Sequence, residues 1–81
     1  MKTVGDLKKK LEGSGIRKDA YCLPGQYPGN ETYVLEKGAM DRFMVYYYER
    51  GQRSDLVYYD TEVTAINAFY EKISTDKSVY G

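Results

Sequence analysis

Glu49 and Arg50 are neighbouring residues that combine an acidic and a cationic side chain, the types needed for an acid beside an electrophile. They end an apolar run typical of a β-strand, in which consecutive side chains point to opposite faces. The two groups would therefore meet at one reacting atom only if a turn bent them together. The chain also has no histidine, the residue most often used as a general base near neutral pH. We expect no enzymatic activity, and a small enzyme that uses Glu49 is the least favoured alternative.

Cys22 is the only cysteine, so the chain cannot form an internal disulfide. No histidine or cationic cluster lies beside it in the sequence to activate the thiol, which favours a small buried apolar residue over a nucleophile. The phosphate-loop, dinucleotide, zinc and calcium motifs are all missing, so we expect no metal and no cofactor. This cysteine usage is typical of a protein in a reducing cytoplasm.

The charges of the chain are balanced, with 12 Lys and Arg against 12 Asp and Glu. This balance argues against a general nucleic-acid-binding protein. The run Lys8 to Lys10 is interpreted as a solvated helix face, because it lacks the interleaved aromatic residues of a nucleic-acid site. The N-terminus has no apolar signal region, and no apolar run is long enough to cross a bilayer. We therefore expect a cytoplasmic protein with neither nucleic acid nor membrane as its partner.

Two segments have the periodicity of helices that pack on a core. In 3–12, Thr3 and Asp6 resemble a capping box, and before 62–73 both Asp60 and Thr61 offer capping side chains. Apolar residues recur at helical spacing in both segments. They are Val4, Leu7 and Leu11 in the first segment and Ala65, Ile66, Phe69 and Ile73 in the second.

Three segments, 33–37, 43–49 and 55–60, are rich in aromatic and β-branched residues and predict strands. The polar stretch 50–54 contains a glycine and predicts a hairpin loop, so the last two strands should form an antiparallel pair. Alternation along the middle strand separates two sets of side chains, of which the first is expected to face the core. These sets are Phe43, Val45 and Tyr47, and Met44, Tyr46 and Tyr48.

The remaining segments are expected to be irregular. Residues 14–32 are rich in Gly and Pro and predict a long loop, in which 20–23 forms a short extended piece and Ile16 and Leu23 are buried. Residues 74–81 carry no periodic pattern and are expected to be frayed or disordered.

This order of elements predicts one α+β domain over residues 1–81, with a small antiparallel sheet of three to four strands and an N-terminal and a C-terminal helix on one face. A chain of 81 residues is expected to have a single core. A bulge near Leu56 would place Leu56 and Tyr59 on the same side of the sheet. The predicted core consists of Leu7, Phe43, Val45, Leu56, Ile66 and Phe69.

Tyrosine is unusually frequent, with ten residues against two Phe and no Trp. Tyrosine combines a large apolar ring with a polar tip, which suits a half-buried sheet face and a binding surface equally well. Because aromatic residues favour strands whatever the function, the scaffold role is the more common of the two for any single tyrosine.

The segment 46–56, Tyr-Tyr-Tyr-Glu-Arg-Gly-Gln-Arg-Ser-Asp-Leu, followed by an aromatic residue and an acidic helix start, resembles a family. It is similar to small bacterial α+β immunity proteins of polymorphic toxin systems, including contact-dependent growth inhibition. The segment 31–37 fits the same pattern. The resemblance implies a cytoplasmic protein that binds one cognate toxin domain, blocks it and has no chemistry of its own.

The residues around the predicted hairpin have the types that interfaces favour, since Tyr and Arg often supply most of the binding energy. We expect them to be partly exposed in the free protein. The main alternative to toxin binding is a self-associating structural or adaptor domain whose tyrosine-rich sheet face pairs with another copy. The predicted partner-binding residues are Tyr46, Tyr48, Glu49, Arg50 and Arg53.

Overall fold

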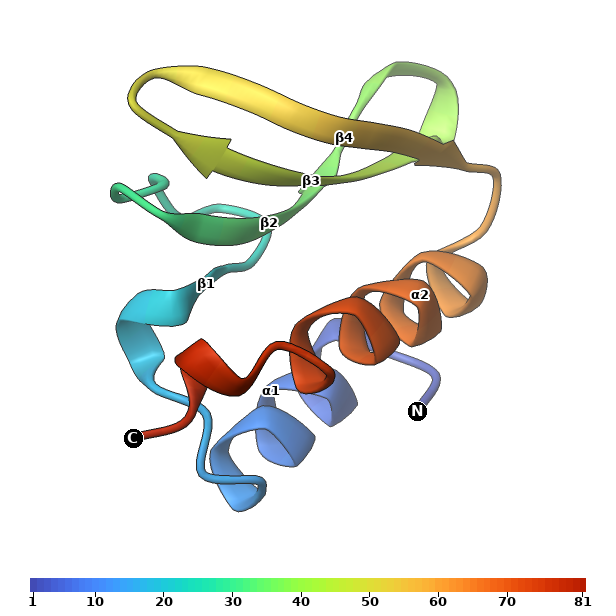
Figure 1. Ribbon diagram of the computed structural model, residues 1–81. Coiled ribbons are helices and arrows are strands. Elements are labelled where there is room, and N and C mark those ends of the chain that lie inside the picture. The colour runs from blue at the N-terminus through green and yellow to red at the C-terminus, as the bar shows by residue number, and fades with distance from the viewer.

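The computed structural model describes residues 1–81 and places two helices on one side of a four-stranded sheet (Figure 1). The strands lie in the order β1-β2-β3-β4. This arrangement confirms the predicted α+β class and the position of both helices on one side. The elements are α1 (Val4–Gly13), β1 (Tyr21–Cys22), β2 (Thr32–Lys37), β3 (Phe43–Glu49), β4 (Gln52–Tyr59) and α2 (Glu62–Ser74), with 3-10 turns η1 (Lys18–Ala20), η2 (Ala39–Asp41) and η3 (Lys77–Val79).

Both helices begin at the capping residues expected from the sequence. The Thr3 hydroxyl accepts from the Asp6 amide at 3.1 Å, and the Asp6 carboxylate accepts from the Thr3 amide at 3.3 Å. At α2 the Thr61 hydroxyl accepts from the Thr64 amide at 3.2 Å. These bonds satisfy N–H groups that a helix start otherwise leaves unpaired. Each helix extends one residue beyond its predicted end.

The helices and the inner side of the sheet share one apolar cluster. Helix α2 packs directly on β2, β3 and β4, and α1 packs against α2. The side chains of Leu7, Phe69 and Ile73 are completely buried in this cluster. Phe43 and Val45 enter it from β3. The predicted core is therefore confirmed for Leu7, Phe43, Val45, Ile66 and Phe69.

The hairpin between β3 and β4 is tighter than predicted. Arg50 and Gly51 alone form the turn, with φ of 52° and 76°, and β4 begins at Gln52. Two central residues with positive φ are typical of a type I′ turn, whose twist matches that of the strands. The expected loop over 50–54 is thus wrong, and β4 runs to Tyr59 rather than spanning 55–60. The polar residues 52–55 are typical of a loop, but here they lie on an edge strand, where exposed polar side chains are tolerated.

A bulge interrupts the pairing of β3 with β4. Val45 faces Val57 and Tyr47 faces Ser54, so Tyr46 lies opposite both Asp55 and Leu56. The bulged residue Asp55 has φ of 55°. Leu56 consequently packs with Tyr46 on the far side of the sheet, while Tyr59 packs on the helix side. The expectations that Leu56 joins the main core and shares a side with Tyr59 are wrong.

The segment predicted as a loop over 14–32 contributes a strand to the sheet. Strand β1 pairs in parallel with β2, so that Tyr21 faces Tyr33 and Cys22 faces Val34. The sheet is therefore mixed rather than wholly antiparallel. The connection 23–31 carries the chain back along the sheet before β2 begins, which gives both strands the same direction. Ile16 and Leu23 are buried, as predicted.

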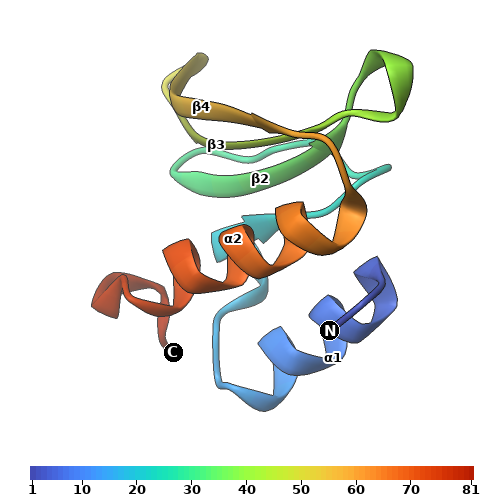
Figure 2. The same cartoon turned by 90° about the vertical axis from the view of Figure 1, so that its right-hand side faces the viewer.

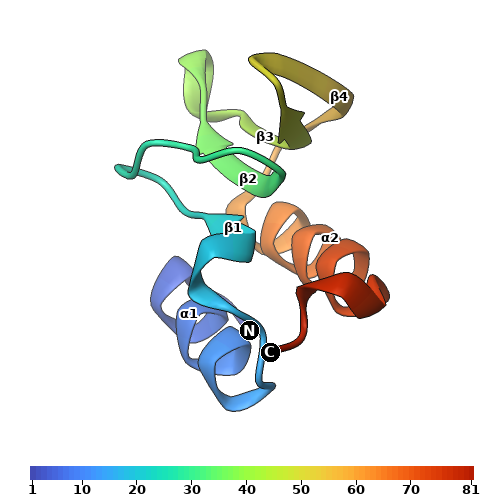
Figure 3. The ribbon, with the colours of Figure 1, turned by 60° about the vertical axis from the view of Figure 1, so that its left-hand side comes forward.

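The C-terminal segment 74–81 is ordered, contrary to expectation. Val79 is buried, and its carbonyl accepts from the Arg17 amide at 2.9 Å. Ile16 and Tyr80 form an antiparallel bridge, which places the end of the chain beside the segment that follows α1 (Figure 3). Because these contacts join residues far apart in the sequence, local periodicity carries no sign of them.

None of the helices combines the length and the apolar character needed to span a membrane.

Candidate functional site

The side of the sheet that faces away from α1 and α2 carries no helix (Figure 2). We call this side the outer face. Strand side chains alternate between the two sides of a sheet, and those that point outward form a second, smaller apolar cluster. This confirms the predicted assignment of Met44, Tyr46 and Tyr48 to the side away from the core. The cluster consists of Cys22, Val34 and Tyr46, with Met44, Tyr48 and Leu56 packed around them.

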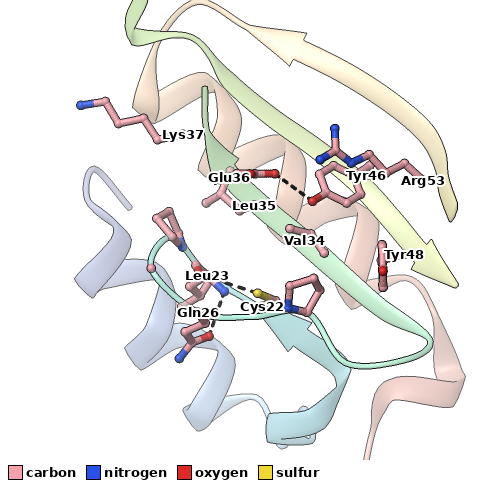
Figure 4. A pocket seen from close by; sticks show the side chains of 13 residues that line it. Cys22, Leu23, Gln26, Val34, Leu35, Glu36, Lys37, Tyr46, Tyr48 and Arg53 are labelled. Atoms are coloured by element: carbon pink, nitrogen blue, oxygen red, sulfur yellow. Dashed lines mark hydrogen bonds between the residues drawn. The ribbon is translucent and has the colours of Figure 1, made fainter. Parts of the chain in front are cut away.

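A pocket of about 400 Å³ lies between the outer face and the connection 23–31 (Figure 4). We call it the outer pocket. Its volume is within the range of sites that hold small ligands or anchoring side chains, about 300–1,000 Å³. One wall comes from Leu23, Pro24, Gly25, Gln26 and Pro28, and the other from Cys22, Val34, Leu35, Glu36, Lys37, Tyr46, Tyr48 and Arg53.

Tyr46 lines the outer pocket and is only 3% exposed. Its hydroxyl donates to Glu36 Oε2 at 2.8 Å. Burial, followed by this bond and the Glu36 charge, raises the pKa of Tyr46 to about 12. The expectation that Tyr46 is partly exposed in the free protein is therefore wrong. A partner that reaches this surface meets a fixed aromatic ring rather than a free anchor.

Tyr48 and Arg53 face each other across β3 and β4, and both line the outer pocket. The guanidinium of Arg53 lies over the Tyr46 ring, 5.1 Å from its centroid. The electrons of the ring attract a guanidinium in this position, so the ring orients the guanidinium while its N–H groups stay free to bind a partner. The Arg53 side chain takes part in none of the ion pairs of the chain. Tyr48 is half-buried and Arg53 is exposed, as expected for both.

Glu49 and Arg50 lie at the end of the hairpin, outside the outer pocket. Glu49 Oε1 is 3.9 Å from Arg50 Nε, and the Arg50 side chain is 85% exposed. Such a pair contributes at most about 1 kcal/mol to folding. The Arg50 amide donates to Asn30 Oδ1 at 2.9 Å, which ties the turn to the connection 23–31. Glu49 lines neither pocket of the molecule.

Cys22 is buried at the base of the outer pocket, as predicted for a small apolar residue. Burial, with a smaller effect of the Glu36 carboxylate, raises the pKa of its thiol. A raised thiol pKa lowers the fraction of reactive thiolate. No group of His, Cys, Asp and Glu side chains is arranged to hold a metal ion.

A second pocket of about 250 Å³ lies where the C-terminal segment meets the sheet. Tyr33 there donates to Asp76 Oδ2 at 2.7 Å, and its ring packs edge-on against Tyr47 with centroids 4.9 Å apart. Hydrogen bonds from Tyr33 and Ser78 lower the pKa of Asp76. Tyr33, Asp76 and Ser78 are hydrogen-bonded to one another, so we interpret this group as a fastening for the C-terminal segment.

Of the predicted partner-binding residues, Tyr46, Tyr48 and Arg53 line the outer pocket, whereas the sequence did not indicate Glu36 or that Pro24, Gln26 and Pro28 lie beside these residues. Alternation within β2 places Glu36 on the same side as Val34. The alternation of residues does not reveal that Glu36 pairs with Met44 on β3. This pairing brings the Glu36 carboxylate to the Tyr46 hydroxyl.

Comparison with known proteins identifies no relative, since no family model, no curated protein and no solved structure matches the chain.

Proposed function

We propose that the protein is a cytoplasmic, non-catalytic binding module that neutralises a bacterial toxin domain by protein–protein interaction through the outer face and the hairpin. The binding role is supported by the outer face, where tyrosines and an unpaired arginine surround a pocket that no helix covers. The toxin as partner rests on the resemblance of 46–56 to immunity proteins.

The composition of this surface supports a protein partner. Interfaces are enriched in Tyr and Arg, and their energetic centres are buried aromatic or arginine anchors surrounded by a polar rim. Tyr58, which is 58% exposed, faces Met44 across the strands and extends the aromatic surface beyond the pocket. We propose that Tyr48 and Arg53 form the centre of the interface and that Glu49 and Arg50 belong to its rim.

Tyr46 has a different role from the one expected of an anchor. Because its ring and hydroxyl are already occupied within the protein, it contributes by fixing the positions of Glu36 and Arg53. We therefore propose direct partner contacts for Tyr48, Glu49, Arg50 and Arg53 only.

Self-association is the second candidate, and the open edge of β4 favours it. This strand pairs only with β3, so the backbone groups along its other edge are available to a further strand. The bulge at Asp55 and the charges of Arg53 and Asp55 oppose such pairing, since bulges and charged side chains protect edge strands. Sedimentation over a hundredfold range of concentration decides this point, because self-pairing predicts a mass that rises with concentration.

The proposed function is tested with the double variant Tyr48→Ala and Arg50→Ala. The protein and the variant are used to capture partners from native lysate, and the captured protein is then expressed with and without each of them to measure growth. We expect a partner that arrests growth alone, is neutralised by the parent, and binds the double variant at least about 30-fold more weakly, which corresponds to about 2 kcal/mol.

The matched control is Lys8→Ala with Lys9→Ala, two exposed residues of α1 on the side away from the outer face. This variant should bind and protect like the parent. A double variant at 48 and 50 that binds and protects as well as the parent would move the interface away from the hairpin.

A further inference from the structure

We propose that the outer pocket binds an acidic side chain, an Asp or Glu within a peptide segment of the partner protein, through the guanidinium of Arg53. The inference rests on the proposed function in that it specifies which chemistry of the partner this surface recognises.

Arg53 is already in the position that carboxylate recognition needs. Its guanidinium is held over the Tyr46 ring at 5.1 Å, and no carboxylate of the chain pairs with it. The planar guanidinium matches both oxygens of a carboxylate, and a group held in advance loses less conformational freedom on binding. The ring that orients Arg53 is itself fixed by its bond to Glu36.

The other charged groups of the outer pocket are already paired within the protein. Lys37 Nζ lies 3.6 Å from Asp41 Oδ1, which offsets its charge. Glu36, the only carboxylate that lines the pocket, accepts from the Tyr46 hydroxyl. Glu36 stays charged while it accepts this bond, so the lining carries two cations, Lys37 and Arg53, against one carboxylate. Arg53 is the cation of the lining that has no ion-pair partner.

The apolar side chains of the outer pocket indicate which residues should flank the acidic residue in the bound peptide. Leu23 lies across the outer pocket from Val34 (Figure 4), and Pro24 and Pro28 also line it, so apolar side chains are present in the same pocket as Arg53. An acidic side chain flanked by apolar residues fits this combination better than a run of acids, which would leave charges against apolar walls. The recognised segment should therefore alternate acidic and apolar side chains.

The test is a titration of the isotopically labelled protein, followed by nuclear magnetic resonance, with an acetylated and amidated peptide Gly-Leu-Glu-Leu-Gly. We expect saturable shifts at Cys22, Val34, Tyr46, Tyr48 and the Arg53 side chain. The matched peptide Gly-Leu-Lys-Leu-Gly should bind at least about tenfold more weakly, the size expected for one charged hydrogen-bonded contact.

The variant Arg53→Gln should weaken binding of the glutamate peptide by about tenfold or more. The control Arg42→Gln removes the same charge from an exposed arginine that pairs with Asp60 outside the pocket, and it should change binding less than twofold. Arg53→Lys keeps the charge but loses the planar group, so intermediate binding is expected. Chemical shifts away from the pocket show whether each variant is folded.

Equal binding of the glutamate and lysine peptides, or equal effects of the substitutions at 53 and 42, would overturn the inference. The same holds if no shifts saturate with the glutamate peptide. These results are independent of partner capture. Suppose that substitution of Tyr48 and Arg50 abolishes partner capture but the glutamate peptide does not bind. The proposed function would then stand, and only the acidic ligand would be rejected.

Discussion

At the scale of single residues, the outer pocket depends on Tyr46 more than on any residue expected to touch a partner. Its ring lies under Arg53 and its hydroxyl holds Glu36. One buried tyrosine thus fixes a cation and an anion at separate places on the same surface. This explains why a residue of interface type is buried in the free protein: its contacts arrange the groups that are exposed.

The raised pKa of Tyr46 predicts how stability changes at high pH. The folded-state pKa of about 12 lies above the ordinary value of 10. The stabilisation from the neutral phenol is therefore complete below pH 10 and is lost as the pH rises from 10 towards 12. Tyr46→Phe removes this phenol, so the free energy of unfolding should fall less steeply over that range than in the parent.

Denaturant unfolding at a series of pH values from 8 to about 12 measures this difference. The control Tyr58→Phe removes the hydroxyl of a ring that is 58% exposed, on the same outer face. Parallel curves for the parent and Tyr46→Phe would contradict the coupling of Tyr46 to folding. A change in slope shared by both variants would show that the effect does not belong to Tyr46.

At the scale of elements, the hairpin turn positions Arg50 and sets the register that brings Arg53 opposite Tyr48. Gly51 has φ of 76°, a conformation in which a Cβ atom is strained. Gly51→Ala should therefore lower stability by about 1–2 kcal/mol, although an added methyl would meet no other atom. The denaturation midpoint measures this change.

Gly13 provides the matched control, because an added methyl there also meets no atom and its φ is not in the positive range. Gly13→Ala should leave stability unchanged or raise it by up to about 1 kcal/mol, since alanine is the better helix former. Equal effects of the two substitutions would show that the turn does not hold Gly51 in the left-handed conformation.

The elements that could be predicted are those with local signals. The capping pair of Thr3 and Asp6 located α1, and the spacing of Ile66, Phe69 and Ile73 located α2. Both helices could be placed within one residue because their caps and apolar stripes lie within their own segments. The polar residues 52–55, by contrast, belong to a strand that has a neighbour on one side only and so carries no apolar alternation.

The parts that could not be predicted depend on partners distant in sequence. Strand β1 forms only by pairing with β2, which lies further along the chain. The C-terminal segment is held in place by the bond of Asp76 with Tyr33 and by the bridge of Tyr80 with Ile16. The outer pocket has the same origin, since its two walls come from the connection 23–31 and from strands that precede and follow it in the chain. Its residues could be named by type, but their meeting point follows from where the connection 23–31 lies against the sheet.

At the scale of the whole molecule, the sheet separates a large core from a small outer cluster. The main cluster buries side chains from both helices, while the outer cluster has three buried residues, Cys22, Val34 and Tyr46. A protein of this size has few other sources of stability, so most of its free energy of folding must come from the main core. The outer face is then free to carry the groups for which we propose a binding role.

This division predicts different results for two apolar truncations. Phe69 is completely buried between α2 and the sheet, and Phe69→Ala should lower the free energy of unfolding by about 3–5 kcal/mol. Leu56 is only partly buried beside Tyr46, and Leu56→Ala should lower it by less than about 2 kcal/mol. Unfolding by urea, followed by circular dichroism, compares the two variants with the parent. If Phe69→Ala shifted the midpoint no more than Leu56→Ala does, α2 would not pack on the sheet as the structure shows. If Leu56→Ala proved as costly as Phe69→Ala, the outer face would be a second structural core, and its tyrosines would owe their presence to folding rather than to a partner.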